Sequence, residues 1–407
     1  MKTVGSRREG HVKDRSQHLH TVQREIPVRI PHFLASIGAN RRGRVPRPSW
    51  CTYLVTLRCN ARCQMCDSWR LPPSAELSPA EVEQIFGALG RLDVVRLSGG
   101  EPFLRHDFAP LTRAIDEASR PLVLHITTNG SLPDAVEAFA SSFPRPRALH
   151  FLVSFDGLAH VHDHNRGASV SFARAEETVR RLVKLRQRRG IRVTVQHTVI
   201  SRASLEDARA LQQHFAALGV EVVTVLAYAS SATYSLGAQR RDASPSYPEP
   251  GFPLHPKLAG CDVLTLVRGE LERTRWARDP LLAIGKSYYL RGLYSRLHGD
   301  SPPWPRPRCV ALRSHLRILP DGQVPVCQFN GQVVGDLRSS TPEAVWRSPL
   351  ATAARRWVDR CPGCWAECEV IPNAIYTADI LHGVAAARNF AGSSHRRHSI
   401  VSEGGAS

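Results

Sequence analysis

The sequence contains no long apolar run, and no stretch approaches the roughly 18 consecutive apolar residues that a membrane-spanning helix needs. This absence excludes a transmembrane protein. The first residues also lack the apolar segment and the small-residue cleavage site of a secretory signal. Ten cysteines are too few for a disulfide scaffold in a chain of 407 residues. We therefore expect a cytoplasmic protein whose cysteines stay reduced.

Acidic residues are scarce relative to basic ones, since 54 Lys and Arg oppose 36 Asp and Glu and give a net charge of +18. The excess is concentrated at the start, where residues 1–50 hold eleven Lys or Arg and three acids. We expect residues 1–45 to form a basic, flexible extension. As an alternative, a short helix with Ile30, Phe33, Leu34 and Ile37 on one face would give weak contact with an anionic membrane surface.

Short apolar segments alternate with amphipathic ones through the first half of the chain. This alternation is typical of parallel strands joined by crossover helices. The expected strands are Tyr53–Thr56, Val94–Leu97, Leu122–Thr127, Leu149–Ser154, Val193–Val199 and Val220–Leu226. The pattern predicts an α/β fold, a partial (βα)6 parallel barrel, over residues 46–230.

The second half of the chain loses this rhythm. Residues 231–308 are rich in Pro, Ser and Arg and predict a helical and Pro-rich connector. Residues 309–388 predict a small C-terminal domain of a β-hairpin and helices, in which Leu316–Leu319 pairs with Val324–Cys327 across Pro320 to Gln323. The polar residues 389–407 are expected to be disordered.

Cys59, Cys63 and Cys66 form a C-x3-C-x2-C pattern just after the first expected strand. Three thiolates on one loop can converge on a metal site. Structural zinc usually takes four protein ligands, whereas a 4Fe-4S cluster held by three cysteines leaves one iron open to a small molecule. An open iron indicates an enzyme.

This cysteine loop resembles that of the radical S-adenosylmethionine (SAM) enzymes. The resemblance implies a 4Fe-4S cluster that binds SAM and an electron donor such as flavodoxin or ferredoxin. Cleavage of SAM then gives methionine and a 5'-deoxyadenosyl radical, which abstracts hydrogen from a substrate.

Other residues match the positions at which this family binds SAM, and all of them lie at or near the ends of expected strands. Gly99, Gly100, Glu101 and Pro102 would hold the amino group, with the carboxylate of Glu101 accepting hydrogen bonds from it. Asn129 follows the third strand, Ser154 and Asp156 would lie near the ribose, Arg166 near the carboxylate and Met65 near the adenine. Ordinary turns and caps remain the alternative for each.

Five further cysteines, Cys309, Cys327, Cys361, Cys364 and Cys368, gather in the C-terminal region. Their spacing alone allows either zinc or an iron-sulfur cluster. The pattern resembles the twitch or SPASM extension of radical SAM enzymes. The resemblance implies one auxiliary 4Fe-4S cluster held by Cys309, Cys327, Cys361 and Cys364, with Cys368 as a further candidate ligand, an unligated neighbour, or a ligand of a second cluster.

Cys261 precedes an expected helix from Val263 to Arg273 and is a candidate hydrogen-atom donor, although a lone cysteine more often only packs, as we expect for Cys51. The sequence predicts oxidation, epimerisation or cross-linking of a small metabolite, with a peptide or a lipid as alternative substrates. A zinc-containing nucleic-acid-binding protein would also fit the charge, but no recognition helix or stacking platform is present, so we expect no nucleic-acid partner.

Overall fold

The computed structural model describes residues 29–72, 74–167, 171–229, 254–274 and 280–381. The strands are β1 (Trp50–Thr56), β2 (Val94–Gly99), β3 (Val123–Thr128), β4 (Leu149–Phe155), β5 (Arg192–Val199), β6 (Glu221–Leu226), β7 (His315–Ile318), β8 (Gln323–Pro325) and β9 (Val333–Asp336). The helices are α2 (Pro79–Leu89), α3 (Phe108–Ser119), α4 (Pro133–Ser142), α5 (Ala159–Arg166), α6 (Phe172–Arg189), α7 (Arg202–Glu206), α8 (Ala208–Ala217), α9 (Val263–Thr274), α10 (Pro280–His298), α11 (Pro342–Arg347), α12 (Pro349–Arg360) and α13 (Glu367–Tyr376). Residues 29–41 are also helical.

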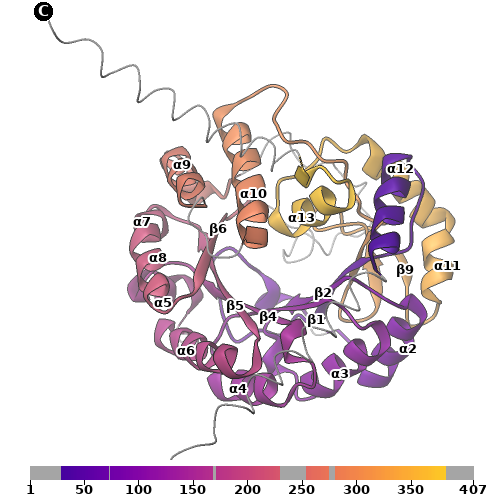
Figure 1. Cartoon of the computed structure of the whole chain (residues 1–407), viewed down its shortest axis with the longest axis horizontal. Coiled ribbons are helices and arrows are strands. Elements are labelled where there is room, and N and C mark those ends of the chain that lie inside the picture. Colours follow the sequence, from indigo (N-terminus) through magenta and orange to yellow (C-terminus); the bar gives the residue numbers. More distant parts are fainter. Residues whose placement is uncertain (1–28, 73, 168–170, 230–253, 275–279, 382–407) are drawn as a thin grey trace, which may run out of the picture.

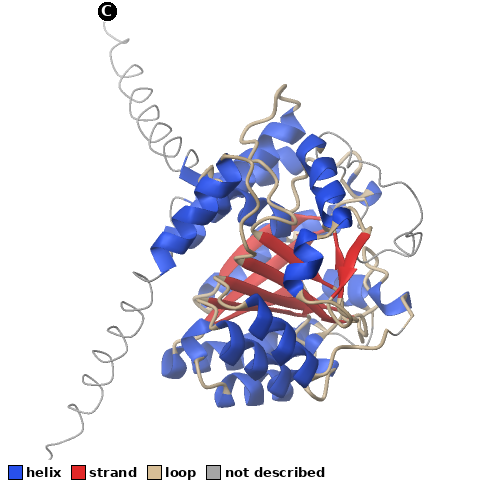
Figure 2. Ribbon diagram, turned by 90° about the vertical axis from the view of Figure 1, so that its right-hand side faces the viewer, coloured by secondary structure: helices blue, strands red, loops and turns tan. Residues whose placement is uncertain are grey.

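Seven parallel strands form the main sheet, in the order β6-β5-β4-β3-β2-β1-β7. The α/β class and all six expected strands are confirmed, and β7 extends the sheet beyond β1. Figure 1 shows the helices from α7 round to α2 following the outside of the curved sheet, with α10 and α13 across its opening. Figure 2 shows the strands between these two groups of helices. The parallel strands therefore end together, facing α10 and α13.

The prediction that Leu316–Leu319 and Val324–Cys327 pair as a hairpin in the C-terminal region is wrong. The turn is present, since the Leu319 amide donates to the carbonyl of Gln323 (2.8 Å). However, β7 pairs in parallel with β1, and β8 pairs instead with β9. Leu316 and Ile318 pack in the main core while Arg317 lies between them, an alternation that suits a barrel strand as well as a hairpin strand.

Local sequence signals explain how the first outer helix begins. Ser78 and Glu81 of α2 form a capping box, and Pro79 occupies its first turn. Val82, Ile85 and Phe86 then pack against the outer face of the strands. The same arrangement of apolar side chains between helix and sheet continues around the barrel and forms the main core.

Residues 29–41, which we expected to be part of a flexible arm, form a helix docked on the barrel; residues 1–28 lie outside the described part of the chain. Asn40 donates to Ser314 Oγ (2.7 Å) and to the carbonyl of Tyr376 (3.0 Å). Arg29 donates to the carbonyl of Leu92 (2.9 Å), just before β2. This helix therefore covers the end of the barrel at which the strands begin.

The expected connector contains α9 and α10, while residues 230–253 of it lie outside the described part. A second apolar cluster joins these helices to β5, β6 and α13. At its centre, Trp365 stacks on Tyr289, donates to the carbonyl of Tyr289 (2.8 Å) and occupies the space beside Gly292 of α10. None of the described helices is long and apolar enough to cross a membrane. The expected disordered tail, residues 389–407, also lies outside the described part, and the expected domain boundaries stay predictions.

Candidate active site and auxiliary thiol site

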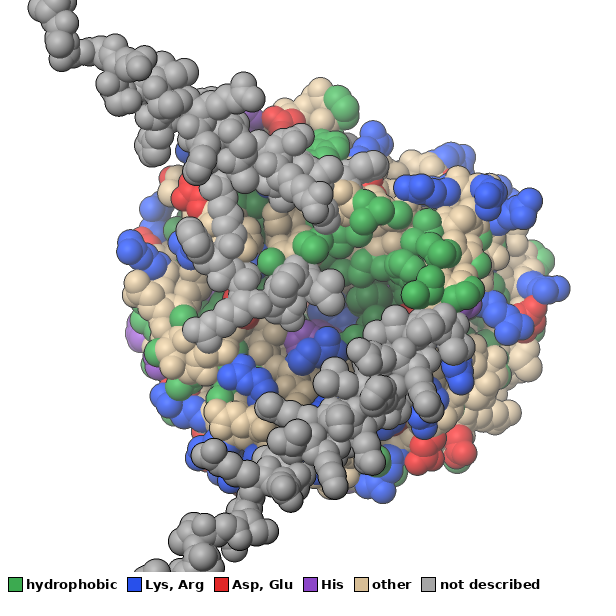
Figure 3. All heavy atoms as spheres, in the orientation of Figure 1, with side chains coloured by type: hydrophobic (Ala, Val, Ile, Leu, Met, Phe, Trp, Pro, Cys, Tyr) green, Lys and Arg blue, Asp and Glu red, His purple; other side chains and the backbone are tan. Residues whose placement is uncertain are grey.

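A cavity of about 290 Å³ lies at the carboxyl ends of the barrel strands. Its wall includes residues from the ends of β1 to β6, from β7 and from the start of α13. Of the residues expected to act on SAM, those that line it are Cys59, Cys63, Cys66, Met65, Gly99, Gly100, Asn129, Ser154 and Arg166. The surface view shows a hollow near the middle of the face drawn in Figure 1, bordered partly by apolar and partly by basic side chains (Figure 3).

The loop after β1 presents the first three thiols to this cavity. The amides of Ala61 and Ser68 lie within hydrogen-bonding distance of the sulfurs of Cys59 and Cys66 (3.4 Å each). Such N–H groups stabilise thiolate sulfurs, and hydrogen bonds to sulfur are a standard feature of iron-sulfur ligation. These amides favour the charged form of the two sulfurs, while burial outweighs them and raises the pKa of both thiols.

Gly99 and Gly100 allow the loop after β2 to run directly against the cysteine loop. A Cβ atom at Gly100 would lie 2.1 Å from the carbonyl oxygen of Arg58, and one at Gly99 would lie 2.1 Å from that of Thr56. The amides of Gly100 and Glu101 donate to these two carbonyls, Thr56 and Arg58 (2.7 and 2.9 Å). The two glycines thus fix the position of the thiols.

Glu101 and Pro102 are not among the residues that line the cavity, and the expected contact of Glu101 with the SAM amino group stays a prediction. The Glu101 carboxylate is fully buried and accepts hydrogen bonds from the hydroxyl of Thr128 (2.8 Å) and the amides of Asn129 (2.7 Å) and Phe103 (3.2 Å). Burial raises the pKa of Glu101 to about 7 despite these bonds. In this structure Glu101 holds the third strand's loop in place.

Asp156 also lies behind the cavity wall. Its carboxylate accepts two hydrogen bonds from Arg166, at 3.0 and 2.6 Å, and both side chains are buried. Arg166 itself lines the cavity. Asp156 therefore orients the guanidinium of Arg166, and its expected place near the ribose stays a prediction.

Sequence reasoning missed a layer of inward-facing polar residues on neighbouring strands. Arg96 on β2 and Arg317 on β7 are the register partners of Thr52 on β1, and all three line the cavity. Glu367 accepts from Arg96 (3.0 Å). A charged residue within the apolar run Val94 to Leu97 was the available signal, because only a barrel interior gives such a side chain a polar surrounding.

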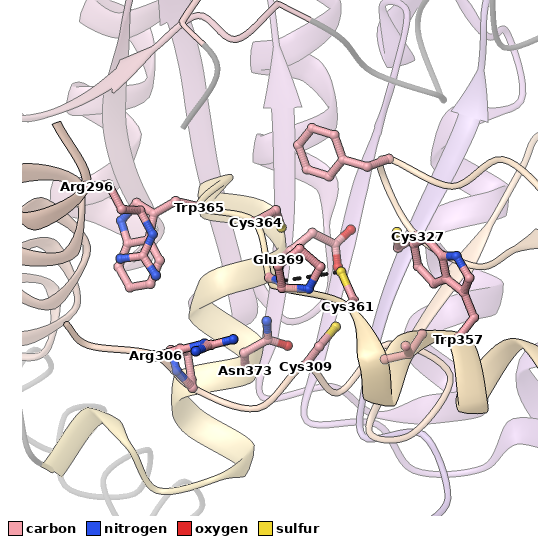
Figure 4. Close-up of a pocket in the computed structure, with 15 residues that line it drawn as sticks. Arg296, Arg306, Cys309, Cys327, Trp357, Cys361, Cys364, Trp365, Glu369 and Asn373 are labelled. Carbon is pink, nitrogen blue, oxygen red and sulfur yellow. Dashed lines mark hydrogen bonds between the residues drawn. The ribbon is translucent and has the colours of Figure 1, made fainter. Parts of the chain in front are cut away.

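The second group of thiols divides between two cavities. Cys309, Cys327, Cys361 and Cys364 surround one small pocket (Figure 4). Cys368 instead lines the barrel cavity, where Arg317 lies 3.9 Å from its sulfur. Helix α13 begins at Glu367, so the chain turns between Cys364 and Cys368. Cys261 lines neither cavity and packs against the α9 and α10 cluster, and Cys51 is buried in the main core.

Glu369 lies between the two cavities. Its carboxylate points into the pocket of four thiols (Figure 4). It also accepts from Arg317 (2.7 Å), whose guanidinium lines the barrel cavity, and pairs with His315 (3.2 Å). Burial acts to raise the pKa of Glu369, but His315 and Arg317 outweigh it and lower this pKa to about 2. The Glu369–Arg317 ion pair thus has one member in the wall of each cavity.

A metal cluster that binds these thiols must displace their protons. Burial raises the pKa of Cys59 to about 11 and that of Cys63 and Cys309 to about 12. Because the metal ligand is the thiolate, cluster binding at these positions releases protons. Within the described residues, no three Cys, His, Asp or Glu side chains converge closely enough to hold a single metal ion.

A parallel α/β barrel with three thiols at its strand ends and four more in an adjoining pocket has the thiol sets that iron-sulfur proteins use. Residues 53–214 match the model of the Radical SAM superfamily, and residues 309–368 match SPASM, an iron-sulfur cluster-binding domain. The chain belongs to the radical SAM superfamily and carries a C-terminal SPASM-type domain. The zinc-containing nucleic-acid-binding alternative is therefore wrong. The cofactors of this radical SAM protein are SAM, a 4Fe-4S cluster and an auxiliary iron-sulfur cluster.

Curated relatives share part of this chain. The GTP 3',8-cyclase of Synechocystis sp. is 32% identical over 154 residues, which cover 36% of this chain and 44% of the cyclase. The pre-heme d1 synthase of Dinoroseobacter shibae is 29% identical over 182 residues, 42% of each chain. The matches thus span less than half the length of these relatives.

Solved structures share the fold over a larger part of the chain. The protein anSMEcpe, solved with bound AdoMet, has 16% identity and a TM-score of 0.53, covering 77% of this chain and 84% of its own. Streptococcus suis SuiB bound to the precursor peptide SuiA has 14% identity and a TM-score of 0.53, covering 79% and 70%. At this identity the likeness shows the fold alone.

Proposed function

We propose that Cys59, Cys63 and Cys66 hold the cluster that binds SAM. The support is their position on one wall of the barrel cavity, with amides near two of the sulfurs. SAM would occupy the space lined by Gly99, Gly100, Asn129, Ser154, Arg166 and Met65. When bound, the cluster and SAM supply the 5'-deoxyadenosyl radical.

Cys309, Cys327, Cys361 and Cys364 hold the auxiliary cluster in this proposal, and Cys368 stays outside the ligand set. The four thiols surround one pocket, whereas Cys368 lines the other cavity. The amide of Gly363 lies 3.4 Å from the sulfur of Cys361, as in the first loop. Four thiolates leave no iron open, so the auxiliary site exchanges electrons rather than binding substrate.

The reaction that this arrangement supports best is oxidation of a small polar molecule bound between the two sites. The carrying observation is that Arg317 lines the barrel cavity while its partner Glu369 lines the auxiliary pocket, so this ion pair has one member in the wall of each. A substrate that loses a hydrogen atom to the SAM-derived radical would lose its second electron toward the auxiliary pocket, and a proton to water.

A small polar substrate is supported by the side chains away from the cysteines. Thr52, Gln196, Thr198, Tyr228 and Gln328 line the cavity and offer hydrogen-bonding groups. The curated relatives are named for GTP and pre-heme d1, which are small molecules. An electron donor of the flavodoxin or ferredoxin class completes the set of partners.

The test is anaerobic incubation of the iron-loaded protein with dithionite and SAM, followed by assay of 5'-deoxyadenosine. We expect the wild type to produce it, Cys63→Ala to produce none, and Cys261→Ala, which removes a thiol outside both cavities, to match the wild type. Deuterium transfer from labelled metabolites into 5'-deoxyadenosine then identifies the substrate. No product from the wild type would refute the proposal.

Epimerisation is the second candidate, and the position of Cys368 favours it over the donor we expected, Cys261. Cys368 lines the barrel cavity, and burial raises its pKa to about 11, so its S–H bond persists at neutral pH. A thiol can return a hydrogen atom to a substrate radical. In D2O, an epimerase would place deuterium at the attacked carbon and lose this in Cys368→Ser, whereas an oxidase would show neither effect.

A further inference from the structure

Exposed arginines stand next in sequence to residues that line the pocket of four thiols. Arg308 and Arg360 directly precede Cys309 and Cys361, and both are exposed, as are Arg306 and Arg356. Arg306 itself lines the pocket, where Figure 4 shows it beside Asn373 and Cys309. We call Arg306, Arg308, Arg356 and Arg360 the basic rim.

The acidic residue beside the basic rim, Asp359, is already paired with two arginines. Asp359 accepts hydrogen bonds from Arg308 (2.8 Å) and from buried Arg313 (3.0 Å). No hydrogen bond or ion pair to another described residue engages the side chains of Arg306, Arg356 or Arg360. The rim therefore carries a positive charge that its own carboxylate does not neutralise.

The end of the N-terminal helix adds to the same surface. Arg308 donates to the carbonyl of Asn40 (3.2 Å), and Arg313 donates to the carbonyls of Gly43 and Arg44 (3.0 Å each). Arg42 and Arg44 are exposed. Part of the basic excess of the first 50 residues thus lies beside Arg308 and Arg313.

Apolar side chains occupy the middle of this surface. Pro307, Trp357 and Pro362 line the pocket and are half-buried. An apolar centre within a charged rim is the composition of a protein-binding surface, and transient redox complexes use small interfaces of this kind. Arg306 lines the pocket, and the other rim residues are next in sequence to residues that line it, so a protein bound there would come close to the thiols.

We propose that an acidic one-electron carrier protein of the ferredoxin or flavodoxin class docks on the basic rim and exchanges electrons with the auxiliary site. The inference rests on the proposed function, because it needs a cluster in that pocket. In turnover, the electron that the auxiliary site takes from the substrate passes to the oxidised carrier, which is thereby reduced. The same surface lets a reduced carrier pass an electron to that site in the reverse direction. A nucleic acid or an anionic membrane would match the charge but not its placement around a redox site.

The test measures how fast reduced flavodoxin reduces the auxiliary cluster at low ionic strength, by freeze-quench electron paramagnetic resonance. Only the first cluster's signal responds to SAM, which separates the two. For Arg356→Glu/Arg360→Glu we expect a rate at least about tenfold lower than in the wild type. Added salt should slow the wild type and leave the variant nearly unchanged.

The matched control is Lys184→Glu/Arg188→Glu, which makes the same charge change at two exposed positions four residues apart on α6. It should keep the wild-type rate. Dithionite needs no docking surface and should reduce the auxiliary cluster equally in all three proteins.

Three results would overturn the inference. The first is an unchanged flavodoxin rate in the α12 variant, and the second is an equal loss in the α6 control. The third is loss of binding to DNA or to phosphatidylglycerol vesicles in the α12 variant with no change in electron transfer. If the wild type holds no iron in the second site, the proposed function fails as well, and metal analysis separates that case from failure of docking alone.

Discussion

At the scale of single residues, the active-site loops can pack closely because two glycines in them have no side chain. Gly99 and Gly100 lack the Cβ that would overlap the backbone of the cysteine loop. Glu101 and Asp156 act one step behind the cavity, by holding Asn129 and Arg166. Residues that match a binding motif therefore divide into those that face the ligand space and those that hold the others in place.

Gly100→Ala should lower the free energy of unfolding by about 3 kcal/mol, because the new methyl group would overlap the carbonyl of Arg58. It should also displace the cysteine loop and abolish SAM cleavage. Denaturant unfolding and the 5'-deoxyadenosine assay check this. Gly87→Ala, in helix α2 with open space around it, is the control and should raise stability by about 0.5 to 1 kcal/mol. Equal behaviour of the two variants would contradict this account.

At the scale of elements, the helix at residues 29–41 docks on the barrel largely through polar side chains. Its polar side faces the barrel, where strand starts leave carbonyl and hydroxyl groups that need partners, and Ile30 and Leu34 are 48% and 59% exposed. Buried hydrogen bonds therefore hold this helix.

Asn40→Ala should lower the free energy of unfolding by about 2 kcal/mol, because it leaves the buried carbonyl of Tyr376 and the hydroxyl of Ser314 without their donor. Leu34→Ala on the same helix should change stability by less than about 0.5 kcal/mol, since Leu34 is exposed. Thermal unfolding of both variants provides the measurement. A larger effect at Leu34 than at Asn40 would show that the helix is held by apolar contacts instead.

At the scale of the whole molecule, the barrel and the C-terminal region share residues across their boundary. Strand β7 completes the sheet beside β1, and the start of α13 contributes Glu367 and Cys368 to the barrel cavity and Glu369 to the auxiliary pocket. The barrel cavity and the auxiliary pocket are consequently built in part from the same short segment, residues 367–369.

Cys364→Ala should lose about half of the iron and sulfide of the reconstituted enzyme, because it removes one of four thiols around the auxiliary pocket. Cys368→Ala should retain the full content, because its thiol lies in the other cavity. Metal and sulfide analysis of both proteins decides between them. Equal loss in the two variants would place Cys368 among the ligands.

The sequence by itself determined the parts that depend on local patterns. The β/α alternation predicted the six barrel strands, and the three-cysteine loop predicted the family and its cofactors. Each of these rests on residues close together in the chain, whose spacing alone fixes which chemistry they can support.

Only the tertiary structure decided which elements meet. The alternation of Leu316, Arg317 and Ile318 fits a hairpin and a barrel edge equally, and pairing with β1 is a contact across more than half the chain. Cys364 and Cys368 are four residues apart yet face different cavities, because a helix begins between them. Arg96 lines the cavity because the sheet curves into a barrel, which a short strand segment does not reveal. Strand partners and side-chain directions at element boundaries are set by packing between distant segments, which local spacing does not encode.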